Sequence, residues 1–313
     1  MRDGRPVVLI TGASGFVGRN LAPAMTRAGW FVRRAVRQRS GMPNEVVVES
    51  LGPTTDWRDA LADVDAVVHL AARVHHKREE HAVELYRSIN IEGTLRLARD
   101  AAAAGVGQFV FISTVLVHGR NNDGRAPFRE SDVPTPRGLY GMSKAAAEAG
   151  LKDLAQSSAM SVTVIRPPLV YGAGARGNFS LLQKAVMRGI PLPFAAIQNR
   201  RAFLSVGNLI SFIQHRLSHP SGKFDIFLLA DEEQVSTPEF IERLAKAGNT
   251  APRLFRVPVP LLGALLKLSG RREANDGLLG SLELDVSKAR SIGWRPQIPL
   301  DEGLRQAFIP PDS

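Results

Sequence analysis

Cysteine is absent from this chain of 313 residues. Its absence excludes disulfide bonds, thiolate metal sites and a cysteine nucleophile. Long apolar runs are missing as well, since none approaches the ~18 residues that a transmembrane helix needs. The first residues lead directly into an apolar stretch, without the pattern of a secretory signal. We therefore expect a cytoplasmic protein without a transmembrane segment.

Acidic residues are fewer than basic ones, with 30 Asp and Glu against 40 Lys and Arg, for a formal net charge of +10. Such an excess can indicate a nucleic acid, an anionic membrane or an anionic small ligand. The basic residues are dispersed, apart from short clusters at 33–39 and 271–272. Because dispersed basic residues are typical of a solvated surface, we expect no nucleic-acid partner.

The chain does contain a regular alternation of short apolar segments and longer helical ones. Strands are predicted at 7–10, 31–36, 46–48, 65–70, 109–113, 161–166 and 224–229. Helices are predicted from residue 18 to about residue 29, at 92–104 and at 140–156. This alternation is typical of the α/β class, with a Rossmann-type doubly wound parallel sheet. Ligands of such sheets bind at the carboxyl ends of the strands.

The alternation becomes irregular after Pro167, where Pro, Gly and Arg are frequent. We therefore predict an NAD(P)-binding Rossmann domain over 1–171, to which the strand at 224–229 returns. The segments 172–223 and 230–313 are predicted to form a smaller mixed α/β C-terminal substrate lobe.

A glycine-rich turn, Thr-Gly-Ala-Ser-Gly-Phe-Val-Gly, follows the first strand at 11–18. Strand, glycine turn and helix together present backbone N–H groups and a helix N-terminus to a diphosphate. We expect Gly12 to allow the tight turn, Gly15 to let phosphate approach and Gly18 to let the helix pack closely. The spacing differs from the usual Gly-x-Gly-x-x-Gly fingerprint. The alternative is a glycine turn selected for packing alone.

Tyr140 and Lys144 lie four residues apart at the start of an Ala-rich helical segment, which places both on one helix face. A free tyrosine has a pKa of about 10 and is a poor base at neutral pH. A neighbouring ammonium favours the phenolate, so the pair can exchange a proton with a substrate hydroxyl or carbonyl.

Several further motifs follow in order along the chain. They are His69-Leu-Ala-Ala72, Asn90-Ile-Glu-Gly-Thr94, Phe111-Ile-Ser-Thr114, Val117-His-Gly119, Arg166-Pro-Pro-Leu-Val-Tyr-Gly172, the segment 199–209, Leu284-Asp-Val-Ser-Lys-Ala289 and Gly293-Trp-Arg-Pro296. With the glycine turn and the Tyr140–Lys144 pair, they resemble the extended short-chain dehydrogenase/reductase family. The resemblance is to its nucleotide-sugar (UDP-hexose) epimerase/dehydratase/reductase group, and it covers nearly the whole chain.

The resemblance implies that Tyr140 is the acid/base, that Lys144 activates it and binds ribose, and that Thr114 is their hydroxyl partner, with Ser113 as the adjacent alternative. Cofactor binding is expected at Gly12, Ser14, Gly15, Phe16, Val17, Gly18, Arg37, Ser50, Leu51, Leu70, Ala71, Ala72, Tyr140, Lys144 and Pro167. Substrate binding is expected at Asn90, Thr114, Asn178, Arg201, Arg271 and Arg272. Asn90 could instead cap a helix. A homodimer is also implied by the resemblance.

Two departures from the family pattern are informative. Dehydratases of the group carry an Asp-Glu pair after the active-site Thr, whereas this chain has Val115 and Leu116, so dehydration is not expected. The position that usually holds an adenine-contacting Asp is Ser50 in this chain.

The end of the second strand bears on the choice of cofactor. NAD enzymes place a carboxylate there for the ribose hydroxyls, but this chain has Arg33, Arg34 and Arg37 and no acid before Glu45. Arginine matches the geometry of a 2′-phosphate. We therefore prefer NADP(H), bound near Arg37 or Arg33, with NAD(H) possible. The alternative is that these arginines face solvent.

Two other groups of residues have simpler explanations. His75, His76 and His81 lie near Glu79 and Glu80, but their spacing matches no recognised ligand set, so we expect no metal site. The apolar stretch 260–268 could lie on a membrane, but we prefer a core helix of the substrate lobe.

The resulting prediction is an NAD(P)-dependent oxidoreductase that acts at C4 of a hexose in a UDP-sugar. We favour reduction of a UDP-4-keto-6-deoxy-N-acetylhexosamine in surface-polysaccharide synthesis. One alternative is a 4-epimerase of UDP-glucose or UDP-N-acetylglucosamine. A second is a non-catalytic, NADP-binding redox sensor, although such relatives often lack the tyrosine or the lysine, which this chain keeps.

Overall fold

The computed structural model describes residues 4–74, 82–268 and 277–309. The chain divides into two compact units, each of which we describe by itself. Unit 1 comprises Met1–Val117, Pro134–Arg166 and Ile210–Phe227. Unit 2 comprises His118–Val133, Pro167–Leu209 and Leu228–Ser313.

A seven-stranded sheet forms the centre of unit 1. Its strands are β1 (Val7–Thr11), β2 (Phe31–Val36), β3 (Glu45–Val47), β4 (Ala66–His69), β5 (Gln108–Ile112), β6 (Ser161–Arg166) and β9 (Phe224–Leu228). The order in the sheet is β3-β2-β1-β4-β5-β6-β9, and the pairs from β3 to β6 are parallel. The strand order reverses between β1 and β4, and this switch point is where a doubly wound sheet binds its ligand.

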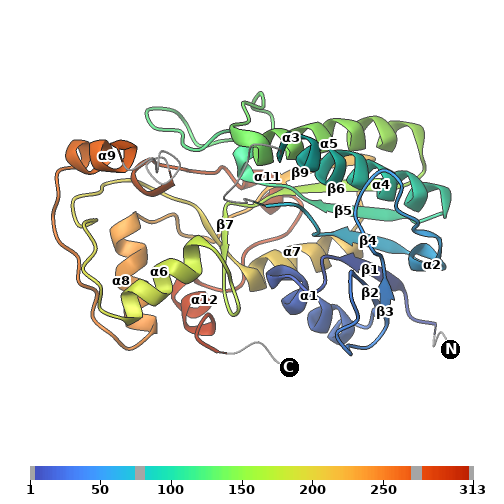
Figure 1. Ribbon diagram of the computed structural model, residues 1–313, viewed down its shortest axis with the longest axis horizontal. Coiled ribbons are helices and arrows are strands. Elements are labelled where there is room, and N and C mark those ends of the chain that lie inside the picture. Colours follow the sequence, from blue (N-terminus) through green and yellow to red (C-terminus); the bar gives the residue numbers. More distant parts are fainter. Residues whose placement is uncertain (1–3, 75–81, 269–276, 310–313) are drawn as a thin grey trace. The chain divides into compact units, whose positions relative to one another are not determined.

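Helices cover both faces of this sheet. They are α1 (Phe16–Arg27), α2 (Arg58–Leu61), α3 (Ala82–Tyr86), the π-helix η1 (Arg87–Glu92), α4 (Gly93–Ala103), the 3-10 helix η2 (Val115–Val117) and α5 (Gly138–Ser157). Figure 1 shows α4 and α5 on one face and α1 on the other. Apolar residues such as Leu97 of α4, Leu151 of α5 and Phe109 of β5 are fully buried in one core cluster. The amphipathic helices are therefore held by burial of their apolar faces against the strands.

Unit 2 contains a two-stranded parallel sheet of β7 (Leu169–Tyr171) and β8 (Phe203–Ser205). Its helices are α6 (Asn178–Met187), α7 (Val206–Ser218, which enters unit 1 at Ile210), α8 (Thr237–Ala247), α9 (Val259–Leu268), α11 (Ser287–Ser291) and α12 (Leu300–Gln306). Phe240 of α8 lies at the centre of the core, stacked on Phe203 at 3.9 Å between ring centroids and edge-on to Tyr171 at 5.7 Å. The Tyr171 hydroxyl donates to the buried carboxylate of Asp231 at 2.7 Å.

The predicted strands and long helices of unit 1 are confirmed, with shifts of one or two residues at their ends. The two units are cut differently from the predicted domains, because residues 118–133 belong to unit 2 and residues 210–223 to unit 1. The first difference follows from backbone pairing, since Asn122 N donates to Ser281 O at 2.9 Å and Phe128 N to Glu283 O at 2.9 Å. The second follows from packing, since Gln214 of α7 donates to Ala24 O of α1 at 3.1 Å.

Helix α9 is apolar but only partly buried. Leu262 and Gly263 are buried, whereas Leu261, Leu265 and Leu268 are exposed. The predicted core helix is therefore packed on one side only. Within the described residues, no helix is both long enough and apolar enough to cross a bilayer.

Candidate active site

The glycine turn after β1 brings backbone closer together than any side chain would allow. A Cβ on Gly18 would lie 2.4 Å from the carbonyl oxygen of Gly12. A Cβ on Gly12, whose φ is +70°, would lie 2.9 Å from the nitrogen of Ala71. The expected roles of Gly12 in the tight turn and of Gly18 in close packing therefore have direct geometric support.

Helix α1 begins directly after this turn without a side-chain cap. Gly15 is the N-cap residue, and the first turn, with Phe16 and Val17, holds no acidic side chain. The first N–H groups of such a helix need acceptors. Together with the positive end of the helix dipole, they make a site for an anion such as a diphosphate. The neighbouring Ser14 is exposed. These residues therefore fit the predicted dinucleotide.

The ends of β1 and β4 are joined by a buried chain of hydrogen bonds. His69 Nδ1 lies 2.6 Å from Thr11 Oγ1, and His69 Nε2 lies 3.0 Å from Thr94 Oγ1 of α4. Thr11 also fixes the chain after β4, because it accepts from Leu70 N at 3.3 Å through its carbonyl and from Ala71 N at 3.3 Å through its hydroxyl. The wall of the predicted cofactor site is thus held by side chains behind it.

Burial, together with the charge of Lys144, lowers the pKa of His69 to about 3. Unfolding restores a pKa of about 6.5, so only the unfolded chain gains a proton as the pH falls below 6.5. The contribution of the neutral imidazole to stability is therefore complete above pH 6.5 and is lost as the pH falls toward 3.

We predict that the unfolding free energy of His69→Gln falls less steeply on acidification than that of the wild type, by about 1.4 kcal/mol per pH unit. Urea unfolding of both proteins at pH 7.5, 5.5 and 4.5 measures this difference. Parallel pH dependences would show that His69 is not the titrating group.

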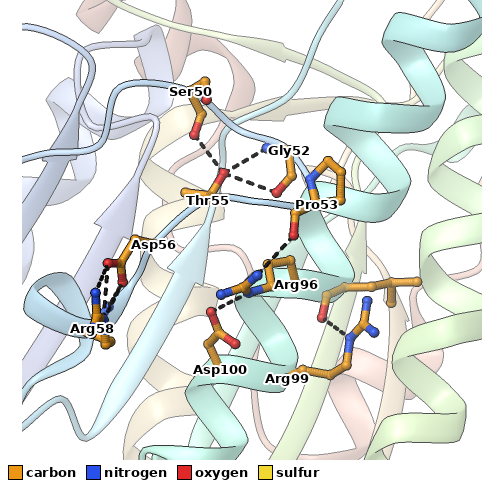
Figure 2. A network of polar contacts seen from close by, with 10 residues as sticks. Ser50, Gly52, Pro53, Thr55, Asp56, Arg58, Arg96, Arg99 and Asp100 are labelled. Atoms are coloured by element: carbon orange, nitrogen blue, oxygen red, sulfur yellow. Dashed lines mark hydrogen bonds and ion pairs between the residues drawn. The ribbon is translucent and has the colours of Figure 1, made fainter.

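The loop after β3 carries Ser50 and Leu51, where an adenine contact is predicted. Thr55 holds this loop, since its hydroxyl donates to Ser50 O at 2.8 Å and accepts from Gly52 N at 2.9 Å (Figure 2). Arg96 of α4 donates to Pro53 O at 3.0 Å and to Asp100 at 2.7 Å (Figure 2). The loop is thus well fixed, although Ser50 does not supply the carboxylate that the family usually has there.

The arginines of β2 differ in their engagement. Arg33 Nη1 donates to the carbonyls of Ala60, at 3.0 Å, and Ala62, and Arg34 Nη1 donates to Pro43 O at 2.7 Å. Arg37 follows the last residue of β2 and is exposed. These contacts argue against the prediction that Arg33 binds a 2′-phosphate, because its guanidinium already donates to carbonyls at the end of α2. Arg37, at the end of β2, remains the residue predicted to bind a 2′-phosphate.

Tyr140 and Lys144 lie in the first two turns of α5, as predicted. Lys144 is fully buried, donates to Ile112 O at 2.7 Å and lies 4.2 Å from the centre of the Phe111 ring. Burial lowers the pKa of Lys144, and the charge of Glu148 partly offsets this effect, so that the resulting pKa is about 7.

Burial raises the pKa of Tyr140, and the neighbouring Tyr86 raises it further. In the protein without ligands, desolvation therefore favours the phenol, against the effect expected of the neighbouring ammonium. The desolvation of the phenol outweighs the attraction of a lysine that is itself only partly protonated at pH 7. Tyr140 is a phenol in this state, ready to act as an acid.

The two candidate hydroxyls at the end of β5 have different partners. Ser113 donates to the carboxylate of Glu148, which also holds Arg166 in a buried ion pair. Thr114 Oγ1 accepts from Leu116 N at 3.2 Å, and among the described residues no side chain is shown to accept its hydroxyl proton. Ser113 thus has a buried carboxylate partner, and Thr114 stays the predicted hydroxyl partner of Tyr140. Val115 and Leu116 form the 3-10 helix η2, so no carboxylic acid follows Thr114.

Asn90 is a buried cross-link between elements. Its Oδ1 accepts from Arg73 N at 2.7 Å, and its Nδ2 donates to Arg73 O at 3.0 Å and to Ser143 Oγ at 3.0 Å. It lies in the π-helix η1, a type of distortion that is frequent at functional sites. Ser143 belongs to α5, so Asn90 ties the chain after β4 to the helix of Tyr140. Because its amide already bonds to protein groups, these contacts favour a positioning role for Asn90 over the predicted substrate contact.

Unit 2 holds the predicted substrate residues Asn178 and Arg201, on different segments. Asn178 is exposed at the start of α6. Arg201 donates to Gly280 O, and burial lowers its pKa to about 10, against the opposing effect of Asp123. Pro167 is buried in unit 2, directly after β6. Ala72 is half-buried in unit 1.

Some predicted residues lie outside the part of the chain that the structure describes. These are the substrate residues Arg271 and Arg272 and the group His75, His76, Glu79, Glu80 and His81. Among the residues that the structure does describe, no three His, Asp or Glu side chains gather as metal ligands would.

The sequence analysis assigned no role to three buried polar residues, although two of them, His69 and Arg166, lie in the quoted motifs and the third is Glu148. Glu148 lies four residues after Lys144, so the spacing that paired Tyr140 with Lys144 continues for one more turn. That repeat was the signal that could have identified it. The contacts with Ser113 and Arg166 are tertiary and could not have been read from spacing.

Comparison with known proteins agrees with this geometry. Residues 8–230 match the model of the NAD dependent epimerase/dehydratase family. A UDP-glucose 4-epimerase from Vibrio cholerae is 37% identical over 96% of this chain and 93% of its own length. The N-acetyl-alpha-D-glucosaminyl-diphospho-ditrans,octacis-undecaprenol 4-epimerase of Escherichia coli O157:H7 is 27% identical over 95% of this chain and 92% of its own length.

Among solved structures, MoeE5 in complex with UDP-glucose and NAD is similar, with a TM-score of 0.78 and 26% identity over 96% of each chain. Other relatives are named as reductases. The match over most of the chain, the Rossmann-type sheet and the Tyr140–Lys144 pair on α5 lead to one conclusion. This chain belongs to the NAD dependent epimerase/dehydratase family.

Proposed function

We propose that this enzyme acts at C4 of the hexose of a UDP-sugar, and that it reduces a UDP-4-keto-6-deoxy-N-acetylhexosamine. The observation that supports the proposal is that Tyr140 shares one face of α5 with Lys144, whose Nζ donates to Ile112 O at the end of β5. A bound NAD(P)H supplies the hydride. Reduction of a ketone also requires a proton at the carbonyl oxygen, and a phenol can donate it.

The other residues have supporting roles in this proposal. The hydroxyl of Thr114 donates to the substrate oxygen while Tyr140 gives up its own proton. Lys144 binds ribose and, once Tyr140 has given up its proton, stabilises the phenolate. Arg201 of unit 2 binds the diphosphate, for which its forked guanidinium is suited. Asn178 contributes a polar group at the start of α6.

The proposed cofactor is NADP(H). Arg37 is exposed at the end of β2, and the chain has no acid between that strand and Glu45. A 2′-phosphate would therefore meet a cation there and no opposing carboxylate.

A second candidate function is 4-epimerisation of a UDP-hexose. It is supported by the relative that is 37% identical and is named a UDP-glucose 4-epimerase. The same Tyr140, acting first as base and then as acid, would serve both reactions.

The nucleotide that the purified protein carries distinguishes the two functions. A reductase exchanges its cofactor in every turnover, so we predict an empty protein, or one with exchangeable NADP(H), after release by denaturation. Purified protein should then oxidise NADPH in the presence of UDP-4-keto-6-deoxy-N-acetylglucosamine and leave UDP-glucose unchanged. Stoichiometric NAD, together with interconversion of UDP-glucose and UDP-galactose, would contradict the proposal and favour the epimerase.

A further inference from the structure

Three side chains of α5 form a continuous stripe on one face of the helix. Tyr140, Lys144 and Glu148 are spaced by four residues, so they lie one above another over two turns. Glu148 is 4% exposed and Lys144 is 1% exposed, although both side chains are ordinarily charged. Buried charges are retained only where partners compensate for their lost hydration. The proposed reaction uses Tyr140 and Lys144 but leaves Glu148 without a role.

The stripe is attached to the end of β5 at two consecutive residues. Lys144 Nζ donates to the carbonyl oxygen of Ile112 at 2.7 Å. The hydroxyl of Ser113 donates to Oε1 of Glu148. The next residue is Thr114, the proposed hydroxyl partner of Tyr140. The two contacts therefore fix the position of Thr114 along the axis of α5.

Glu148 is held in place from a third element. Arg166, the last residue of β6, donates through Nε to both carboxylate oxygens at 3.1 Å and through Nη2 to Oε2 at 2.5 Å. This bidentate geometry fixes the plane of the carboxylate. The pair is buried, with side-chain exposures of 3% and 5%. Glu148 thus cannot move away from the stripe without breaking its ion pair with a buried arginine.

We propose that Glu148 is a positioning residue for proton transfer: its carboxylate fixes Ser113, and with it Thr114, and supplies a counter-charge that favours the ammonium form of Lys144. This inference rests on the proposed function, because the proton transfer by Tyr140 is what the two contacts would serve. The charge of Glu148 opposes the effect of burial on Lys144.

Several other charged or titratable groups surround Lys144. Tyr140 lies on the same helix, His69 at the end of β4 and Arg166 at the end of β6. His69 is neutral above pH 6, because its pKa is lowered to about 3. Arg166 carries a positive charge and is balanced by Glu148. Removing Glu148 should therefore lower the pKa of Lys144, and removing Arg166 should raise it.

The test measures the titration of Lys144 directly, without substrate or cofactor. The protein is produced with lysine labelled at Cε with ¹³C, and Lys144→Arg assigns the signal. Relative to wild type, Glu148→Gln should lower the midpoint of the Lys144 titration by about one pH unit, and Arg166→Met should raise it by about one unit. Glu148→Asp keeps the charge and should restore the midpoint. A structural role alone would change stability without these opposite shifts.

Glu148→Gln and Arg166→Met test the inference independently. If one of them fails to fold, the other still decides the outcome. An unchanged midpoint in Glu148→Gln, or an unchanged or lowered one in Arg166→Met, overturns the inference. If the proposed function also holds, the high-pH limb of kcat for the wild-type reaction should move with the midpoint, and Ser113→Ala should lower kcat without moving it. Shifted midpoints in a protein whose wild type turns over no UDP-sugar would uphold the counter-charge and reject the proposed function.

Discussion

Replacement of Tyr140 by phenylalanine should lower kcat by about a hundred- to ten-thousand-fold, the range that a positioned general acid contributes. The ring of phenylalanine fills the same volume, so the protein should fold. Cofactor affinity should change by no more than about fivefold, because at most one hydrogen bond is lost. Stopped-flow oxidation of NADPH and a fluorescence titration of the cofactor measure the two quantities separately.

Tyr171→Phe is the matched control, since it deletes the same hydroxyl in unit 2. Tyr171 donates to the buried carboxylate of Asp231 at 2.7 Å. Its loss should lower the unfolding free energy by about 1–3 kcal/mol and leave kcat of the folded protein near the wild-type value. A redox sensor would show no dependence of its cofactor response on the Tyr140 hydroxyl. Full turnover by Tyr140→Phe would therefore remove this residue from the mechanism.

Replacement of Gly18 by alanine should damage both stability and cofactor binding. The added Cβ would meet three backbone atoms, at 2.4 Å from Gly12 O, 2.6 Å from Ala13 Cα and 2.9 Å from Ala13 C. Backbone atoms cannot rotate away as a side chain can, so α1 must shift relative to β1. Overpacking of this kind costs about 1–3 kcal/mol. We expect that loss in urea unfolding, together with a drop of about tenfold or more in NADPH affinity by fluorescence titration, since ~1.4 kcal/mol corresponds to tenfold.

Gly107→Ala supplies the comparison for this substitution. A Cβ there would lie 3.7 Å from its nearest neighbour, Asp65 O, which is an ordinary contact. Its stability should stay within about 0.5 kcal/mol of the wild type, and its cofactor affinity should not change. Equal behaviour of the two alanine variants would mean that the turn tolerates movement of α1, contrary to the geometry described above.

The sequence was informative where local pattern and burial agree. β1 was predicted at 7–10 and is Val7–Thr11, because a short apolar, β-branched run followed by glycine has few alternatives. Tyr140 and Lys144 were found because helical spacing alone places them together. The role of Glu148 was not, since it depends on Ser113 and Arg166, which lie 35 and 18 residues away along the chain.

The division of the chain and the state of Tyr140 could not be predicted for the same reason. The segment 118–133 pairs with residues near 281–285, and no local signal encodes a partner so distant in sequence. The sign of the Tyr140 pKa shift depends on how completely the folded protein excludes water from the phenol. A pattern of residues can identify a catalytic pair, but desolvation is a property of the assembled fold.

The uncapped start of α1 would couple cofactor binding to the stability of the first turn of this helix. A Ser, Thr, Asp or Asn at the N-cap can accept from the first N–H groups, whereas Gly15 offers no side chain for this purpose. The diphosphate would take the place of that missing side chain and complete the helix. Ligand occupancy would therefore add to the free energy of unfolding by mass action. The amount of intact protein in a cell would then follow the supply of its dinucleotide, so that nutritional state would govern the lifetime of the enzyme as well as its rate.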